Sequence, residues 1–194
     1  MTARVAALIL AGGRSSRFGR DKLAEPIAGR PMLDHVVERV REVASDIVVV
    51  TAAGTTPDVH GDVEIVRDDV PYEGPLAGLH VGLAAVDPGV ERVIVVGGDM
   101  PTLVPTVLAR LIAALDRRDA AVLADGARAR PLPLAIRRQA GSTAADDLLA
   151  AGERRLRALL ERLDVEVIPY DLWIEDDPAG ESLRDVDVPD DLPA

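Results

Sequence analysis

Near its N-terminus the chain reads LILAGGRSSRFGRDK (residues 8–22), an apolar run that leads into a loop of glycines and basic residues. The apolar part, 5–10, is long enough for a buried strand and too short for most helices. Glycine lets the backbone turn sharply and approach a ligand closely, because no Cβ stands in the way. Exposed N–H groups in such a turn can point at phosphate oxygens, and arginine and lysine neutralise the charge. The stretch therefore predicts a strand that ends in a cradle for a triphosphate.

The spacing of the glycines excludes the two commonest phosphate-binding loops. A P-loop requires Gly-x-x-x-x-Gly-Lys-Ser/Thr, whereas here Lys22 is followed by Leu23. The dinucleotide fingerprint requires Gly-x-Gly-x-x-Gly and an acidic residue at the end of the next strand. Here two glycines are adjacent and the next expected strand ends in Thr51. A plain strand-to-helix turn with solvated basic residues is the alternative, and the length of the pattern argues against it.

Apolar periodicity alternates between strands and helices along the rest of the chain. Strands are expected at 5–10, 47–51, 63–67, 92–96, 120–124, 132–137 and 165–169, and helices at 31–44, 76–86, 103–117, 142–151 and 154–163. Asp125-Gly126 and a basic loop join the strands at 120–124 and 132–137. His35 is expected to be a helix residue rather than a ligand. Residues 171–194 are expected to be irregular. The alternation predicts an α/β fold with a mostly parallel central sheet and helices on both faces.

The composition describes one ordinary domain without thiol chemistry. At 194 residues the chain can bury a core without disulfides, and nothing divides residues 1–194 into two domains. It has no cysteine and three histidines, which excludes thiolate metal sites and a thiol nucleophile and disfavours a histidine-rich metal site. We find no signal peptide and no segment with the roughly 20 apolar residues of a membrane span, so we expect a soluble cytoplasmic protein.

The net charge of −11 is unevenly distributed. Residues 165–194 contain ten acidic residues and one basic residue, whereas residues 1–30 contain six basic and two acidic residues. An acidic chain of this kind is not expected to bind nucleic acid. The basic N-terminal loop instead indicates a local anion site, and most of the acidic tail is expected to be solvated surface.

Carboxylates occur where expected strands end. Ligands of such sheets bind at the carboxyl ends of the strands, and the Gly-Gly loop, Asp68 and Asp99 all lie there. Asp99 suits Mg²⁺, which takes one or two carboxylates, waters and phosphate oxygens. Its alternative role is to cap the following helix. Asp185 and Asp187 alternate in an extended segment and could share one cation, the alternative being a solvated acidic tail.

Four elements of the chain, in order, resemble the molybdenum cofactor guanylyltransferases, a family of nucleotidyltransferases. They are Leu-Ala-Gly-Gly-x-x-x-Arg-x-Gly-x-Asp-Lys at 10–22, Gly-Pro-Leu-Ala-Gly at 74–78, Asp-x-Pro at 99–101, and Asp-x-Asp-x-Pro-x-Asp-Leu at 185–192. Two features depart from the family pattern. Asp185 and Asp187 stand where many members have asparagine, which adds negative charge near an anionic acceptor, and Gly98 stands where many have cysteine.

The resemblance implies a single-domain, three-layer Rossmann-like fold that binds GTP in its N-terminal half and the pterin acceptor towards its C-terminal half. The residues implied at the nucleotide are Leu10, Ala11, Gly12 and Gly13 at the guanine site and backbone, Arg17 and Lys22 at the triphosphate, and Asp68 at the guanosine. The implied cofactor is Mg²⁺, bound by Asp99 and by Asp187 as a second ligand.

The reaction implied by the resemblance is attack of the terminal phosphate of molybdopterin on the α-phosphorus of GTP, with release of pyrophosphate. The acceptor brings its own nucleophile, so positioning and charge neutralisation by Lys22, Arg17 and Asp99 carry the catalysis. Delivery of an unstable cofactor suggests contacts with insertion chaperones or target enzymes, which no motif identifies.

Three rival functions remain open. One is a cytidylyltransferase for the same pterin. By resemblance Gly12 favours guanine, because relatives that take CTP tend to carry Ala-Ala-Gly where this chain has Ala-Gly-Gly at residues 11–13. A nucleotidyltransferase for another phosphorylated acceptor is the second. The third is a catalytically silent nucleotide-binding regulator on the same fold, against which the presence of Arg17, Lys22, Asp99 and Asp187 argues.

Overall fold

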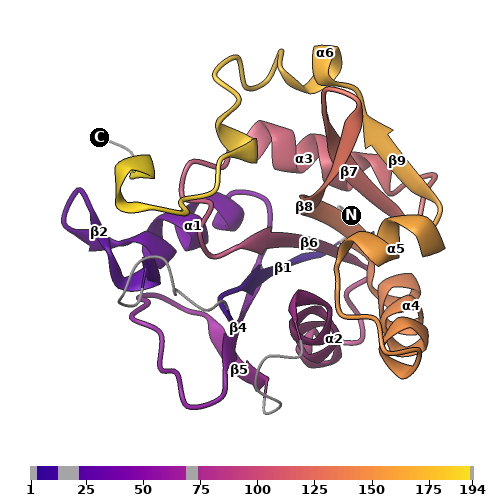
Figure 1. Cartoon of the computed structure of the whole chain (residues 1–194), viewed down its shortest axis with the longest axis horizontal. Coiled ribbons are helices and arrows are strands. Elements are labelled where there is room, and N and C mark those ends of the chain that lie inside the picture. Colours follow the sequence, from indigo (N-terminus) through magenta and orange to yellow (C-terminus); the bar gives the residue numbers. More distant parts are fainter. Residues whose placement is uncertain (1–3, 13–21, 69–73, 193–194) are drawn as a thin grey trace.

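The computed structural model describes residues 4–12, 22–68 and 74–192 (Figure 1). In these parts of the chain a seven-stranded sheet has the order β5-β4-β1-β6-β8-β7-β9. Its strands are β1 (Val5–Leu10), β4 (Asp46–Ala52), β5 (Glu64–Asp68), β6 (Arg92–Gly97), β7 (Ala120–Asp125), β8 (Arg128–Arg137) and β9 (Val165–Ile168). Only β8 runs antiparallel to its neighbours. The expected α/β fold with a mostly parallel sheet is confirmed.

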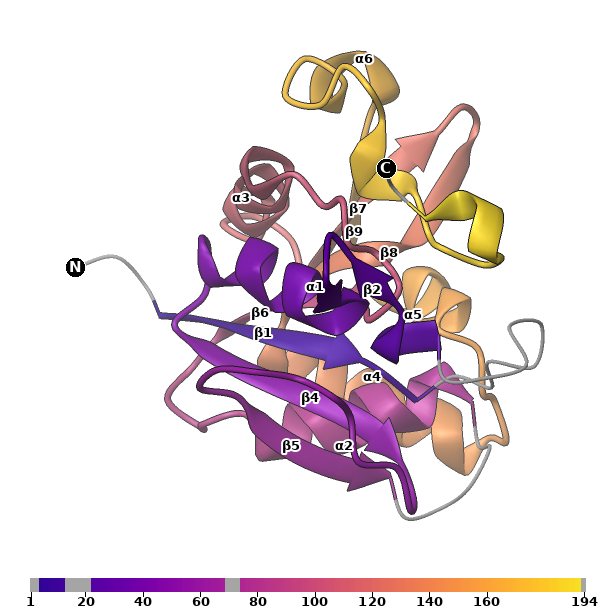
Figure 2. The same ribbon diagram turned by 90° about the vertical axis from the view of Figure 1, so that its left-hand side faces the viewer.

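Helices cover both faces of this sheet (Figures 1 and 2). One face packs against α1 (Met32–Arg41) and α3 (Pro105–Ala114), and the other against α2 (Pro75–Ala85), α4 (Arg138–Ala150) and α5 (Arg157–Arg162). Successive side chains of a strand point to opposite faces. Accordingly Ile9 of β1 lies in the first core and Leu8 in the second, both fully buried. The three layers therefore follow from strands that are apolar on both sides.

The helix α2 lies unusually close to β1 and β4. It begins after Gly74, whose φ of 89° places the backbone where glycine is favoured, and Pro75 occupies its first turn. A Cβ added to Gly82 would come within 2.7 Å of Leu8 Cδ2, so a larger residue there would have to displace the buried Leu8 side chain. The Gly-Pro-Leu-Ala-Gly element thus starts a helix whose small residues allow close packing.

Two features of the strands differ from the sequence expectation. A two-residue connection between β7 and β8 is too short for a crossover, which makes β8 antiparallel. A small hairpin of β2 (Pro26–Ile27) and β3 (Arg30–Pro31) precedes α1, and its Ile27 carbonyl lies 2.8 Å from Nε2 of His35. His35 is a helix residue, as expected.

The C-terminal tail is more ordered than its composition suggests. It contains α6 (Tyr170–Trp173) and the short 3₁₀ turns η2 (Glu181–Leu183) and η3 (Pro189–Asp191). Buried Asp177 accepts hydrogen bonds from the backbone N–H groups of Glu181 and Ser182. Further along, Val186 is 3% exposed and packs with Ile27 of β2 and Met32 of α1, so the tail returns to the N-terminal part of the chain, as Figure 2 shows.

The middle of the sheet determines where the site lies. Strand β1 pairs with β4 on one side and with β6 on the other, so the connections diverge at its carboxyl end. Pairing continues past the strand ends, because Ala11 N–H donates to Val50 O at 2.7 Å and Gly98 N–H donates to Leu10 O at 3.0 Å. In the described part of the chain, no helix combines the length and apolarity needed to cross a membrane.

Candidate active site

Three of the predicted site residues meet at this carboxyl edge. The ammonium of Lys22 donates a hydrogen bond to Asp99 Oδ2 at 2.7 Å and lies 3.6 Å from Asp187 Oδ1. It also donates to the carbonyl oxygen of Val186 at 3.0 Å. The Lys22 side chain is only 15% exposed, so this is a partly desolvated cluster, in which charge interactions are stronger than at an open surface. Residues from both ends and the middle of the chain therefore form one charged site.

The turn after β6 presents Asp99 to this cluster. Met100 N–H donates to Gly97 O at 3.3 Å and closes the turn tightly. A Cβ on Gly97 would overlap Asp99 Oδ1, so the carboxylate occupies the space that a side chain would take. The helix-capping alternative for Asp99 is wrong, because α3 begins several residues later with Val104 as its N-cap.

The tail is fastened beside the same turn by its backbone. Val186 N–H donates to the carbonyl oxygen of Asp99 at 2.9 Å. The carboxylate of Asp191 accepts hydrogen bonds at 3.0 Å from the N–H groups of Asp187 and Val188. These contacts fix the segment that brings Asp187 to Lys22.

The two carboxylates suit a hard divalent cation. Asp99 and Asp187 already share one cation, the Lys22 ammonium, and Mg²⁺ bound with phosphates needs only one or two carboxylates. Among the described residues no group of three or more potential ligands occurs, so waters and phosphate oxygens would have to complete the coordination shell. The residues fit Mg²⁺ provided that the ammonium moves away from them.

The predicted nucleotide residues lie along the same edge. Leu10, buried Ala11 and exposed Gly12 leave β1, and a Cβ on Gly12 would approach Ala52 N to 3.4 Å. Asp68 ends β5, which lies beyond β4, so it is roughly 10 Å from β1 along the sheet. Gly13 and Arg17 fall outside the described residues. The structure thus brings Lys22, Asp99 and Asp187 together and places Asp68 apart from them.

One polar residue at this edge was missed by the sequence analysis. Thr51, the penultimate residue of β4, is fully buried, and its Oγ1 has no hydrogen-bond partner in the described structure. Buried hydroxyls are normally paired, so the unpaired Oγ1 of Thr51, beside Ala11, is an exception among the described residues. The only signal in the sequence was a hydroxyl at the end of a β-branched run.

Asp185 and Asp187, which could share one cation, have different basic neighbours in this structure. Asp187 faces Lys22, whereas Asp185 Oδ1 lies 3.7 Å from Arg130 Nη2. Each aspartate therefore has a basic side chain of its own nearby, Lys22 for Asp187 and Arg130 for Asp185.

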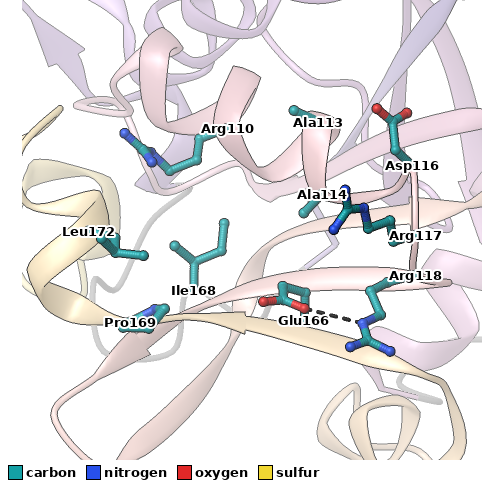
Figure 3. Close-up of a pocket in the computed structure, with 10 residues that line it drawn as sticks. All are labelled: Arg110, Ala113, Ala114, Asp116, Arg117, Arg118, Glu166, Ile168, Pro169 and Leu172. Atoms are coloured by element: carbon teal, nitrogen blue, oxygen red, sulfur yellow. Dashed lines mark hydrogen bonds and ion pairs between the residues drawn. The ribbon is translucent and has the colours of Figure 1, made fainter.

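A hollow of about 620 Å³ lies elsewhere, between α3, β9 and α6 (Figure 3). Four of the charged side chains that line it are paired: Arg118 contacts Glu166 at 3.2 Å, and Arg110 and Asp116 pair with Asp176 and Arg92 outside the hollow. Of the described residues that line it, none is a predicted site residue. The charged cluster at Lys22, rather than this hollow, is the candidate active site.

Comparison with known proteins identifies the family of the chain. Residues 7–167 match the family model described as the MobA-like NTP transferase domain. The chain is 33% identical over 192 residues to a probable molybdenum cofactor guanylyltransferase of Chloroflexus aggregans, covering 95% of this chain and 90% of the relative.

Solved structures share the fold. Molybdopterin-guanine dinucleotide biosynthesis protein A of Archaeoglobus fulgidus superposes with a TM-score of 0.77 at 23% identity, covering 96% of this chain and 94% of that one. The 4-diphosphocytidyl-2C-methyl-D-erythritol synthase of Anaerococcus prevotii gives 0.74 at 17% identity, covering 98% and 95%. The chain belongs to the family of MobA-like NTP transferase domains and is a nucleotidyltransferase.

Proposed function

We propose that this nucleotidyltransferase transfers GMP from GTP to the terminal phosphate of molybdopterin, with release of pyrophosphate, to form the guanine dinucleotide cofactor. The observation that carries the proposal is the cluster of Lys22, Asp99 and Asp187 at the point where the sheet connections diverge. The name of the Chloroflexus relative, which covers nearly the whole chain, supports the choice of substrates.

The nucleotide half of the site is built on β1 and β4. Residues 10–13 line the guanine and the nucleotide backbone. Asp68 holds the nucleoside from the end of β5, on the far side of β4 from β1. Thr51 adds a buried hydroxyl at the same edge. Arg17 and Lys22 bind the triphosphate, because a lysine and an arginine together can neutralise several phosphate charges.

The reaction exchanges one phosphoanhydride bond for another. An oxygen of the acceptor phosphate forms a bond to the α-phosphorus while the bond from that phosphorus to the α–β bridging oxygen breaks. Asp99 and Asp187 are the residues that would hold Mg²⁺, which would supply charge neutralisation at the phosphates when bound. Lys22 moves from the carboxylates to the leaving pyrophosphate and neutralises its developing charge. The protein contributes alignment and charge, and no protein nucleophile is required.

Mass spectrometry of the product formed from GTP, Mg²⁺ and molybdopterin tests the proposal. We expect a product that contains GMP joined to molybdopterin, together with one pyrophosphate per product. Tighter binding of CTP than of GTP in competition would reverse the nucleotide assignment in favour of the cytidylyltransferase. Absence of pyrophosphate release with any phosphorylated acceptor would favour the silent regulator.

A further inference from the structure

The strand β9 forms one rim of the sheet, and its outer edge is open (Figure 1). Among the described strands only β7 pairs with it, in parallel. The Ala120 N–H of β7 donates to Asp164 O at 3.2 Å, and alternate residues of a strand turn their backbone groups to the same neighbour. The N–H and C=O groups of Val165 and Val167 therefore point outward, where a further strand could pair with them.

The two edge strands of the sheet differ in their protection against such pairing. At the opposite rim, β5 has charged side chains at three of its five residues, Glu64, Arg67 and Asp68. Charges on an edge strand discourage pairing with another chain. In β9 the one charged residue is Glu166, which Arg118 of the same chain neutralises at 3.2 Å. The edge of β9 is therefore the one suited to strand addition.

Exposed apolar side chains gather beside this edge. Of the five large apolar side chains that are exposed in the described part of the chain, three lie close together in sequence, Val167, Tyr170 and Leu172. Leu172 also lines the hollow of Figure 3, together with the apolar side chains of Ile168 and Ala114. Exposed apolar surface that is concentrated in one place indicates a contact with another protein.

Two opposite charges without partners lie at the two ends of β9. Because β7 and β9 are parallel, Arg117 lies at the end of the hollow where β9 begins, and Leu172 lies at the other end (Figure 3). Arg110 and Arg118 of the same hollow are paired, whereas Arg117 is exposed and pairs with no carboxylate of the described residues. Asp171, the neighbour of Leu172 in α6, is also exposed and makes no ion pair within the described ranges.

We propose that two copies of this chain dimerise by pairing their β9 strands antiparallel about a two-fold axis. Antiparallel order places the end of one β9 beside the start of the other, so Asp171 of each protomer faces Arg117 of its partner, and the symmetry forms this ion pair twice. Parallel order would instead place the two Arg117 side chains at the same end, where they repel each other. The dimer covers the exposed apolar side chains and leaves the charged cluster at Lys22, near the middle of each sheet, open to substrates.

Sedimentation equilibrium of the full chain over a range of concentrations tests the inference. The net charge of −11 repels two copies at low salt, so the measurement is made at about 0.15 M salt, where the screening length is about 8 Å. We expect the parent to be a reversible dimer. Arg117→Asp and Asp171→Arg should each raise the dimer dissociation constant at least about tenfold, because like charges then face each other twice.

The double variant Arg117→Asp/Asp171→Arg restores opposite charges, so its dissociation constant should return to within about threefold of that of the parent. Arg67→Asp is the matched control, because it makes the same change of charge at an exposed arginine of the other edge strand, β5. Its dissociation constant should stay within about twofold of the parent value. A double variant that dimerises no better than the single variants would overturn the antiparallel arrangement.

Val167→Pro tests the backbone pairing itself. Proline removes the outward N–H of residue 167 and leaves the hydrogen bonds to β7 in place, so this variant should be monomeric with a melting temperature close to that of the parent. A parent that is monomeric at every concentration would overturn the inference, as would a dimer that Arg117→Asp and Val167→Pro both leave intact. The assay uses no substrate, so its outcome is independent of the proposed function.

Discussion

Replacement of Gly97 by alanine tests whether the position of Asp99 controls the reaction. The added methyl would overlap Asp99 Oδ1, while its contacts with Met100 Cγ and Sδ, at 3.4 and 3.5 Å, are close to ordinary packing distances. The carboxylate must therefore shift by roughly 1 Å to reach van der Waals contact. A shift of that size directed away from Lys22 would lengthen the 2.7 Å hydrogen bond from Lys22 to Asp99 Oδ2 beyond hydrogen-bonding distance.

The size of the effect follows from this displacement. A misplacement of about 1 Å at a reacting centre costs up to about 10²-fold in rate, so we expect kcat/KM to fall about 10- to 100-fold. That corresponds to about 1.4–2.7 kcal/mol of lost transition-state stabilisation. The fold should lose no more than about 1 kcal/mol, because the Met100 contacts need to relax only slightly.

Pyrophosphate release with GTP and molybdopterin, together with thermal melting, measures both quantities. Gly78→Ala is the control, because a Cβ there meets Leu10 and Val50 at an ordinary 3.7 Å and should leave both measurements nearly unchanged or raise the melting temperature slightly. A kcat/KM of Gly97→Ala within twofold of the parent would refute the link between the Asp99 carboxylate and catalysis.

Three further predictions concern cation binding, packing and pH. Lys22→Met should bind Mn²⁺ more tightly than the parent when nucleotide is absent, because the ammonium no longer occupies the carboxylates; equal affinities in calorimetry would show that Lys22 does not compete. Gly82→Ala should lower the free energy of unfolding in urea by about 1–3 kcal/mol, because its methyl would overlap buried Leu8, and a more stable variant would contradict the packing. The Arg155 guanidinium and the N–H groups of residues 154 and 155 lower the pKa of Glu153 from 4.5 to about 2. Ionised Glu153 therefore stabilises the fold above pH 4.5. The difference in melting temperature between the parent and Glu153→Gln should shrink as the pH falls from 4.5 towards 2. A difference that grows instead would contradict the stabilising role of the ionised carboxylate.

The main elements of the fold could be predicted from sequence because their apolar patterns are strong. Strands such as β1 and β6 are apolar on both faces, and amphipathic α1 has a clear helical period. The two-residue turn between β7 and β8 would also have revealed the antiparallel strand. The hairpin of β2 and β3 gave no such signal, because two-residue strands are stabilised by tertiary contacts rather than by their own sequence.

The site was predictable in part for a similar reason. Asp99 follows a strand and Lys22 follows a glycine loop, so topology alone brings them to one edge. Asp187 was placed only by resemblance, since a tail segment carries no periodicity that fixes its position. The pairing of Arg130 with Asp185 joins a hairpin to the tail across the fold, and such contacts between distant segments are invisible to local patterns.

A crystal structure with Mg²⁺ and a non-hydrolysable GTP analogue tests the central claim most directly. We predict that the triphosphate lies at the carboxyl ends of β1 and β6, with Lys22 on its phosphates and the metal ion on Asp99 and Asp187. A nucleotide bound elsewhere, with the Lys22 ammonium still 2.7 Å from Asp99, would contradict the account.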